Sequence, residues 1–130
     1  MRVLYVETPY GYGGSMQSLL ELLNNLPADI HAHLVSTYNV TQYKNIPKSV
    51  CSLNVINPPR SSNTKSNIHA VYQILWWAHR ILVLIRRYGI ELIHSNNGPV
   101  SHLGALYAAK LTAKPILVSV RGFTRQTKMF

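Results

Sequence analysis

Two spacings of apolar residues divide the chain into alternating strands and helices. Runs rich in β-branched and aromatic residues predict strands, and apolar residues that recur every three or four positions predict helices. The expected strands are residues 2–8, 31–37, 49–56, 91–96 and 114–122. The expected helices are residues 15–26, 67–88 and 99–111. Residues 38–48 have no clear period, and we expect a loop there.

This alternation predicts an α/β fold, because parallel strands joined by helices require right-handed crossovers. We expect a doubly wound, mostly parallel, Rossmann-like sheet with helices on both faces. Ligands of such sheets bind at the carboxyl ends of the strands, beside the point where the strand order reverses. Three segments are expected to meet there, namely residues 8–15, 94–99 and 121–124.

The first expected strand runs into a glycine-rich turn and then into a helix. Gly11, Gly13 and Gly14 can take backbone angles and close contacts that a side chain forbids. The amides from Ser15 onward would be the unpaired N–H groups of a helix start, which favour a phosphate. The other interpretation is an ordinary turn in which Gly14 or Ser15 caps the helix. The turn alone leaves both interpretations open.

Several nucleotide and metal sites are excluded by missing residues. A dinucleotide fingerprint requires a third glycine where the chain has Met16, and an acid near the end of the second strand, where it has Ser36 and Thr37. A phosphate-binding P-loop requires a lysine that this turn lacks. Only four acids occur and none are close together, which excludes an Asp-x-Asp metal-nucleotide site. We expect no metal and no cofactor. Among those acids Glu7, at a strand end, has no ordinary surface or capping explanation.

Charge narrows the class of partner. Thirteen Lys and Arg against four Asp and Glu give a net charge of +9, which favours nucleic acid, an anionic membrane or phosphorylated ligands. The basic residues are scattered, with only Arg86 and Arg87 adjacent, so we expect no specific nucleic-acid partner. The single cysteine, Cys51, excludes an internal disulfide and fits a cytoplasmic compartment. The first residues are typical of a strand rather than of a signal peptide.

The long helix expected at residues 67–88 is apolar around much of its circumference. Arg80 and Arg87 lie on its polar stripe, and Trp76 and Trp77 are expected to be packing residues. We expect its apolar run to be too short and too interrupted to span a bilayer. The basic residues predict contact with an anionic membrane surface instead.

Three short motifs occur in a fixed order: Gly13-Gly14 before a leucine-rich helix, His94-Ser95-Asn96 before a helix of small residues, and Arg121-Gly122 at the end of the last strand. This order resembles the N-terminal domain of GT-B-fold glycosyltransferases, specifically the retaining group called family 4. The likeness lies in residues 1–27 and 90–123, and residues 37–88 have only a compatible pattern.

The resemblance implies an enzyme that moves a sugar from a nucleotide-sugar donor to a glycan or lipid acceptor. It would be a metal-independent, retaining hexosyltransferase of polysaccharide or lipopolysaccharide biosynthesis. His94 and Asn96 would be catalytic. Contacts to the donor phosphate or the acceptor would come from Gly13, Gly14, Ser15, Asn97, Arg121 and Gly122.

Each of these assignments has a structural alternative. His94 follows the apolar residues Leu92 and Ile93 and could instead be a hydrogen-bonded core histidine. Asn96 and Asn97 could turn the chain and cap the next helix. Arg121 at a strand end could be a solvated charge.

The resemblance also implies that residues 1–130 are a single but truncated acceptor-side domain, because the family's C-terminal domain supplies most donor contacts. Alone, the chain is then expected to have no transferase activity and to self-associate through uncovered apolar surface. We expect a cytoplasmic protein, peripheral at the inner face of the membrane. The alternative is a stand-alone Rossmann-like binding module for an anionic or phosphorylated ligand or for a partner chain.

Overall fold

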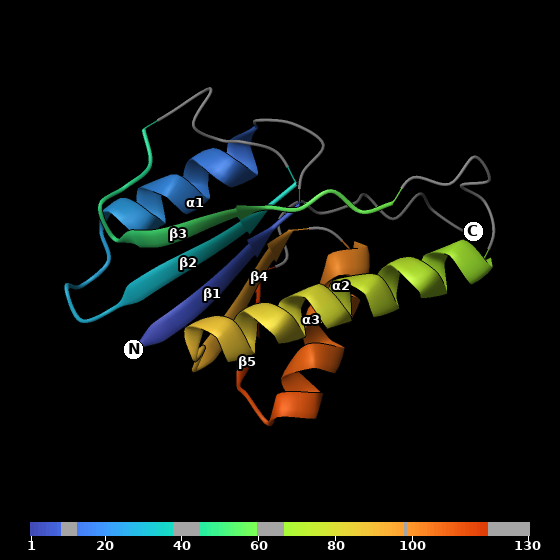
Figure 1. The fold of residues 1–130 in the computed structure, drawn as a ribbon. Coiled ribbons are helices and arrows are strands. Elements are labelled where there is room, and N and C mark those ends of the chain that lie inside the picture. Colours follow the sequence, from blue (N-terminus) through green and yellow to red (C-terminus); the bar gives the residue numbers. More distant parts are fainter. Residues whose placement is uncertain (9–12, 38–44, 60–66, 98, 120–130) are drawn as a thin grey trace, which may run out of the picture.

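The computed structural model of the chain describes residues 1–8, 13–37, 45–59, 67–97 and 99–119 (Figure 1). Within these residues five strands form one sheet in the order β3-β2-β1-β4-β5, and every neighbouring pair is parallel. The strands are β1 (Arg2–Glu7), β2 (His31–Ser36), β3 (Val50–Val55), β4 (Leu92–Asn97) and β5 (Ile116–Val118). The helices are α1 (Gly14–Asn24), α2 (Asn67–Tyr88) and α3 (Pro99–Thr112).

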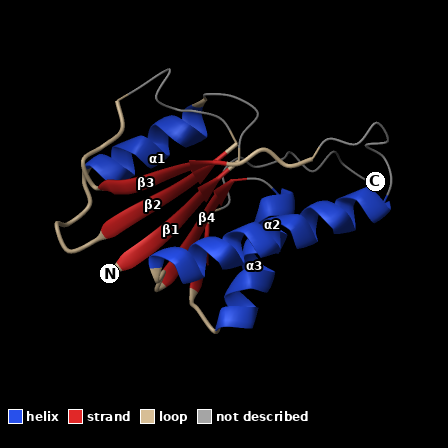
Figure 2. Ribbon diagram, in the orientation of Figure 1, coloured by secondary structure: helices blue, strands red, loops and turns tan. Residues whose placement is uncertain are grey.

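The sheet is covered on both faces, by α1 on one side and by α2 and α3 on the other (Figure 2). Alternate residues of the central strand β1 pack on opposite faces of the sheet. Val3 and Tyr5 pack with α1, whereas Leu4 and Val6 pack with α2 and α3. Because β1 is buried on both faces, its sequence is a continuous apolar run. The predicted doubly wound, Rossmann-like α/β sheet is confirmed.

Most element boundaries lie within one residue of the prediction, and the larger differences are in the first helix and the last strand. The first helix was expected to continue to residue 26 but ends at Asn24. Asn25 closes the last turn, because its backbone N–H donates to the Leu22 carbonyl at 3.1 Å and its side-chain amide to the Glu21 carbonyl at 2.8 Å. The last strand starts at Ile116 rather than at residue 114, and residues 120–122 of the expected strand lie outside the described part.

Helices α2 and α3 cross closely where α3 carries Gly104. A β-carbon at this position would lie 2.5 Å from the β-carbon of Trp77, which is far too close for two carbon atoms. The absence of a side chain therefore sets how near the two helices pack. The end of α2 falls at the predicted residue, because Gly89 adopts a φ of 61°.

The expectation that α2 is too short for a bilayer is not met. The helix is 22 residues long and contains an 18-residue window with a mean hydropathy of 1.3, which by length and composition alone is sufficient to cross a membrane. One side of α2 nevertheless belongs to the core, where Trp77, Ile81 and Ile85 pack with the sheet and with α3. The opposite side is exposed and includes Ile68 and Leu75.

Candidate functional site

The strand order reverses between β1 and β4, so the carboxyl ends of these strands mark the expected ligand edge. Their register is irregular at this edge. Val6 pairs with Ser95, but the next residue, Glu7, pairs with Asn97. Strand β4 thus has one extra residue, Asn96, opposite the step from Val6 to Glu7. An extra residue of this kind redirects a side chain locally.

A buried polar cluster joins β1, β4 and the start of α1. The side chain of Glu7 is fully buried, and Ser15 Oγ donates a hydrogen bond to its Oε1 at 2.9 Å. The side-chain amide of Asn96 donates to the other carboxylate oxygen, Oε2. Both carboxylate oxygens of Glu7 are thus held by hydrogen bonds from neighbouring side chains. The same amide nitrogen of Asn96 lies 3.5 Å from the carbonyl oxygen of Ser15.

The side-chain oxygen of Asn96 is buried and has no hydrogen-bond partner among the described residues. Exchanging the nitrogen and oxygen of this amide would not help, since the oxygen would then face the Glu7 carboxylate, which is also an acceptor. The hydrogen-bond network therefore fixes the orientation of the amide. The Oδ1 of Asn96 is therefore a buried hydrogen-bond acceptor without a donor among the described residues, at the point where the strand order reverses.

His94 lies on the face of the sheet that α1 covers and is only 7% exposed. Its Nε2 is 2.7 Å from Ser119 Oγ, and its ring centroid is 5.2 Å from that of Tyr5. The ring is therefore packed and hydrogen-bonded, as expected for a core histidine. It also lies in β4 two residues before Asn96, close to the candidate site. Its catalytic role stays a prediction.

A second polar group lies on the opposite face, where α3 begins. Ser95 Oγ is hydrogen-bonded to Nδ1 of His102, and Thr8 Oγ1 lies 2.6 Å from Ser101 Oγ. Burial lowers the pKa of His102 from its ordinary value of 6.5, which favours the neutral imidazole. These contacts attach the first turns of α3 to the ends of β1 and β4. Sequence reasoning missed them, since only the strand-to-helix order signalled this junction.

The glycine turn differs from the expectation. Gly13 is the N-cap of α1 with φ −154°, an extended conformation that any residue adopts, and Gly14 is the first helical residue. A β-carbon added to either would meet no atom within 4 Å. Neither backbone angles nor internal close contacts therefore require glycine at these two positions. The predicted ligand contact at Gly13 and Gly14 stays a prediction, and it fits the open, exposed space beside the start of α1.

The structure unites only some of the predicted site residues. Ser15 and Asn96 meet at Glu7, and the backbone of Asn97 pairs with the same residue. Gly11, Arg121 and Gly122 lie outside the described residues. Glu7 itself was absent from the predicted site, although its position at a strand end without a surface role was the available signal.

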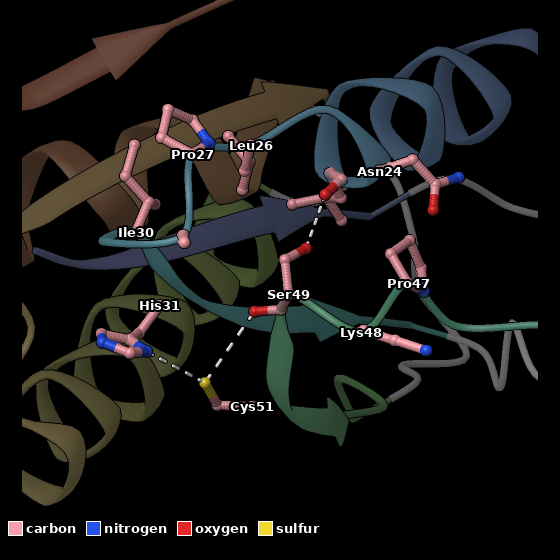
Figure 3. Close-up of a pocket in the computed structure, with 11 residues that line it drawn as sticks. Asn24, Leu26, Pro27, Ile30, His31, Pro47, Lys48, Ser49 and Cys51 are labelled. Carbon is pink, nitrogen blue, oxygen red and sulfur yellow. Dashed lines mark hydrogen bonds between the residues drawn. The ribbon is translucent and has the colours of Figure 1, made fainter.

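A cavity of about 610 Å³ lies at the opposite edge of the sheet, between the end of α1 and the starts of β2 and β3 (Figure 3). Cys51 Sγ is 3.9 Å from Nδ1 of His31 there, and Ser49 Oγ donates to the Leu23 carbonyl at 2.6 Å. Ligands of such sheets bind at the carboxyl rather than the amino ends of the strands. We therefore place the candidate site at Glu7 and Asn96, not in this cavity.

No family model matches the chain, and no curated protein sequence matches it. Solved structures do match its fold. A glycosyltransferase from Rickettsia africae ESF-5 superposes with a TM-score of 0.61 at 17% identity, over 95% of this chain and 31% of that one. MurG of Acinetobacter baumannii superposes with a TM-score of 0.59 at 19% identity, over 95% and 37%.

A third similar structure is the C-terminal domain of the PF1911 hydrogenase from Pyrococcus furiosus. Its TM-score is 0.65 at 9% identity, over 92% of this chain and 90% of that one. The chain thus spans about a third of the length of the Rickettsia and Acinetobacter proteins and nearly all of the Pyrococcus domain. Proteins with different names share this architecture. The comparisons establish that the chain has a Rossmann-like α/β fold, as one glycosyltransferase and one hydrogenase domain do.

Proposed function

We propose that the chain is the acceptor-side portion of a glycosyltransferase that moves a sugar from a nucleotide-sugar donor to a glycan or lipid acceptor. The observation that carries the proposal is the meeting of β1, β4 and α1 at the buried cluster of Glu7, Ser15 and Asn96. The order of the three motifs and the fold likeness to the Rickettsia enzyme support it. Since the chain spans 31% of that enzyme, donor-binding residues would lie in another domain.

The chemistry we propose is displacement of a nucleoside diphosphate from the anomeric carbon through an oxocarbenium-like state. Such a reaction depends on amides and cations that stabilise the charge of the leaving group. His94 and Asn96 would contact the transferred sugar or the acceptor hydroxyl. Arg121 and Gly122 would contact the donor phosphate or the acceptor. In this proposal the transfer is metal-independent and retains the anomeric configuration.

The first experiment is a blot for the native gene product, followed by transfer assays on the protein so identified. A band more than twice 14.7 kDa is expected, because a donor domain must be attached. We expect that protein to transfer sugar and its His94→Gln variant to be slower by about a hundredfold. A His79→Gln variant, altered on the exposed side of α2, is the matched control. A full-length protein that transfers sugar from none of the common nucleotide sugars would contradict the proposal.

The second candidate is a stand-alone binding module for a phosphorylated ligand or a partner chain. The observation that favours it is the match to 90% of the one-domain Pyrococcus chain. A native band at 14.7 kDa would support this candidate, and a search for a partner chain by cross-linking in cells would follow.

We further propose that α2 contacts an anionic membrane, where a lipid acceptor would be found. Its four most exposed apolar side chains are Ile68, Val71, Tyr72 and Leu75, which are 81%, 55%, 52% and 59% exposed. The exposed cations Arg80, Arg86 and Arg87 follow on the same helix. Apolar contact and attraction to anionic lipid act together on such a helix. This arrangement supports a location at the inner face of the membrane.

The membrane contact is testable by co-sedimentation with vesicles. Vesicles that contain anionic phosphatidylglycerol should bind the chain at low salt, and vesicles of phosphatidylcholine alone should bind it far less. Leu75→Glu should weaken binding, whereas Leu22→Glu should not, because Leu22 is exposed on α1 at the other face of the sheet. Equal binding by both variants would contradict a contact through α2.

A further inference from the structure

The start of α1 already has a negative charge beside it. The helix has no acid in its first turn, and its N-cap residue, Gly13, makes no side-chain cap hydrogen bond. The charge comes from Glu7 of β1 instead, through the hydrogen bond from Ser15 Oγ in the first turn. The positive end of a helix dipole is stabilised by a nearby anion. Glu7 therefore occupies the role that a ligand phosphate would otherwise have.

A second anion would be repelled at this position. Glu7 is fully buried and forms no ion pair within the described part of the chain. Charges of like sign interact strongly where water is excluded. The carboxylate thus opposes binding of a phosphate at the first amides of α1. Two kinds of contact were expected at Gly13, Gly14 and Ser15, one to the donor phosphate and one to the acceptor substrate. Of these, the contact to the acceptor is favoured over the contact to the donor phosphate.

The group that lacks a partner at the site is a hydrogen-bond acceptor, so the missing partner is a hydrogen-bond donor. The buried Oδ1 of Asn96 needs an O–H or N–H group, and each oxygen of Glu7 retains capacity for one more hydrogen bond. Sugar hydroxyls are neutral donors and suit two adjacent acceptors. Gly13 and Gly14 are exposed, and a β-carbon added to either would meet no atom within 4 Å, so the start of α1 beside this buried pair is open to solvent.

We propose that Glu7 and Asn96 form a pair of hydrogen-bond acceptors that binds a sugar hydroxyl. We further propose that Glu7 makes the start of α1 selective for this neutral group over phosphate. The inference rests on the proposed function for the identity of the sugar as the acceptor substrate. The selectivity itself can be measured on the 130-residue chain without any transfer reaction.

The test is a pair of titrations followed by amide NMR, with glucose and with inorganic pyrophosphate as the probes. In the wild type, glucose should shift the side-chain amide signals of Asn96, and pyrophosphate should leave the Ser15 and Met16 amides unchanged. In Glu7→Gln, which removes the charge and keeps the size, pyrophosphate should bind at these amides at least about tenfold more tightly. Glucose should bind this variant more weakly.

Glu21→Gln is the matched control, because it removes the same charge from an exposed position of the same helix. It should leave both titrations within about twofold of the wild type. Should Glu7→Gln fail to fold, the wild-type arm alone decides. Pyrophosphate shifts at Ser15 and Met16 in the wild type would overturn the proposal. The proposal would also be overturned if glucose left the side-chain amide signals of Asn96 unchanged, because the missing hydrogen-bond donor would then be a water molecule only.

The two proposals fail in distinguishable ways. If the full-length protein transfers no sugar but the titrations come out as expected, the proposed function is wrong and the hydroxyl-selective pair stands. If transfer occurs but pyrophosphate binds the wild-type chain at α1, the enzyme is as proposed and Glu7 has only a structural role.

Discussion

The imidazole of His33 shows how a single buried side chain makes stability depend on pH. The ring stacks on Tyr88 at 4.4 Å between centroids, and its Nδ1 is 2.8 Å from Ser52 Oγ. Burial lowers the pKa of His33 from 6.5, and the positive charges of His31 and Arg2 lower it further. The folded protein therefore disfavours the charged ring that the unfolded chain accepts.

We predict that the free energy of unfolding falls as the pH is lowered from 7 toward 5. Below pH 6.5 the unfolded state takes up a proton at His33 before the folded state does, so stability rises with pH across this window. Urea unfolding at several pH values measures the slope. The slope should become shallower in His33→Gln, and His79→Gln, altered at an exposed position, should keep the wild-type slope. Parallel curves for the wild type and His33→Gln would contradict the assignment.

At the scale of elements, the crossing of α2 and α3 depends on Gly104. We predict that Gly104→Ala lowers the free energy of unfolding by about 1–3 kcal/mol, because the added methyl group meets Trp77 and the backbone of Ala78 and Ile74. Gly13→Ala, whose methyl group would meet nothing, should change it by less than about 0.5 kcal/mol. Urea midpoints of the two variants provide the comparison. Equal midpoints would mean that the helices separate without cost.

The elements themselves could be predicted from local patterns. The apolar spacing and Gly89 defined α2 to the residue, and the apolar run of β1 predicted a strand. The candidate site could be predicted only as a meeting of three segments. Contact between Glu7 and Asn96 depends on the extra residue in β4, and a register shift between strands 89 positions apart leaves no local pattern.

At the scale of the whole molecule, apolar surface remains uncovered on the β5 side. Leu106, Tyr107 and Leu111 of α3 are 42%, 54% and 76% exposed, and Leu117 of β5 is 53% exposed. Within the described sheet β5 is an edge strand, with hydrogen-bonding groups free along one side. Exposed apolar surface beside a free strand edge is typical of an interaction site.

We predict that the 130-residue chain self-associates through this surface. Sedimentation equilibrium should give an average mass that increases with concentration above 14.7 kDa. Replacing Tyr107 and Leu111 with lysine should return the mass to the monomer value, because the charges oppose burial of the surface. Leu22→Lys on α1 is the control and should leave the association intact. A wild-type chain that stays at 14.7 kDa at all concentrations would contradict this prediction.

The central position of β1 also sets an order of events during synthesis. Strand β1 leaves the ribosome before the other four described strands and can pair with β2 once residue 36 has followed. Its other neighbour, β4, is made some 89 residues later, and β4 supplies the amide that holds Glu7. Until then the carboxylate remains in water beside a half-built sheet. Pairing of distant segments is slow because a long loop must close first. Completion of the ligand edge is therefore a late step of folding, and a nascent chain halted before β4 would present the open edge of β1 to chaperones.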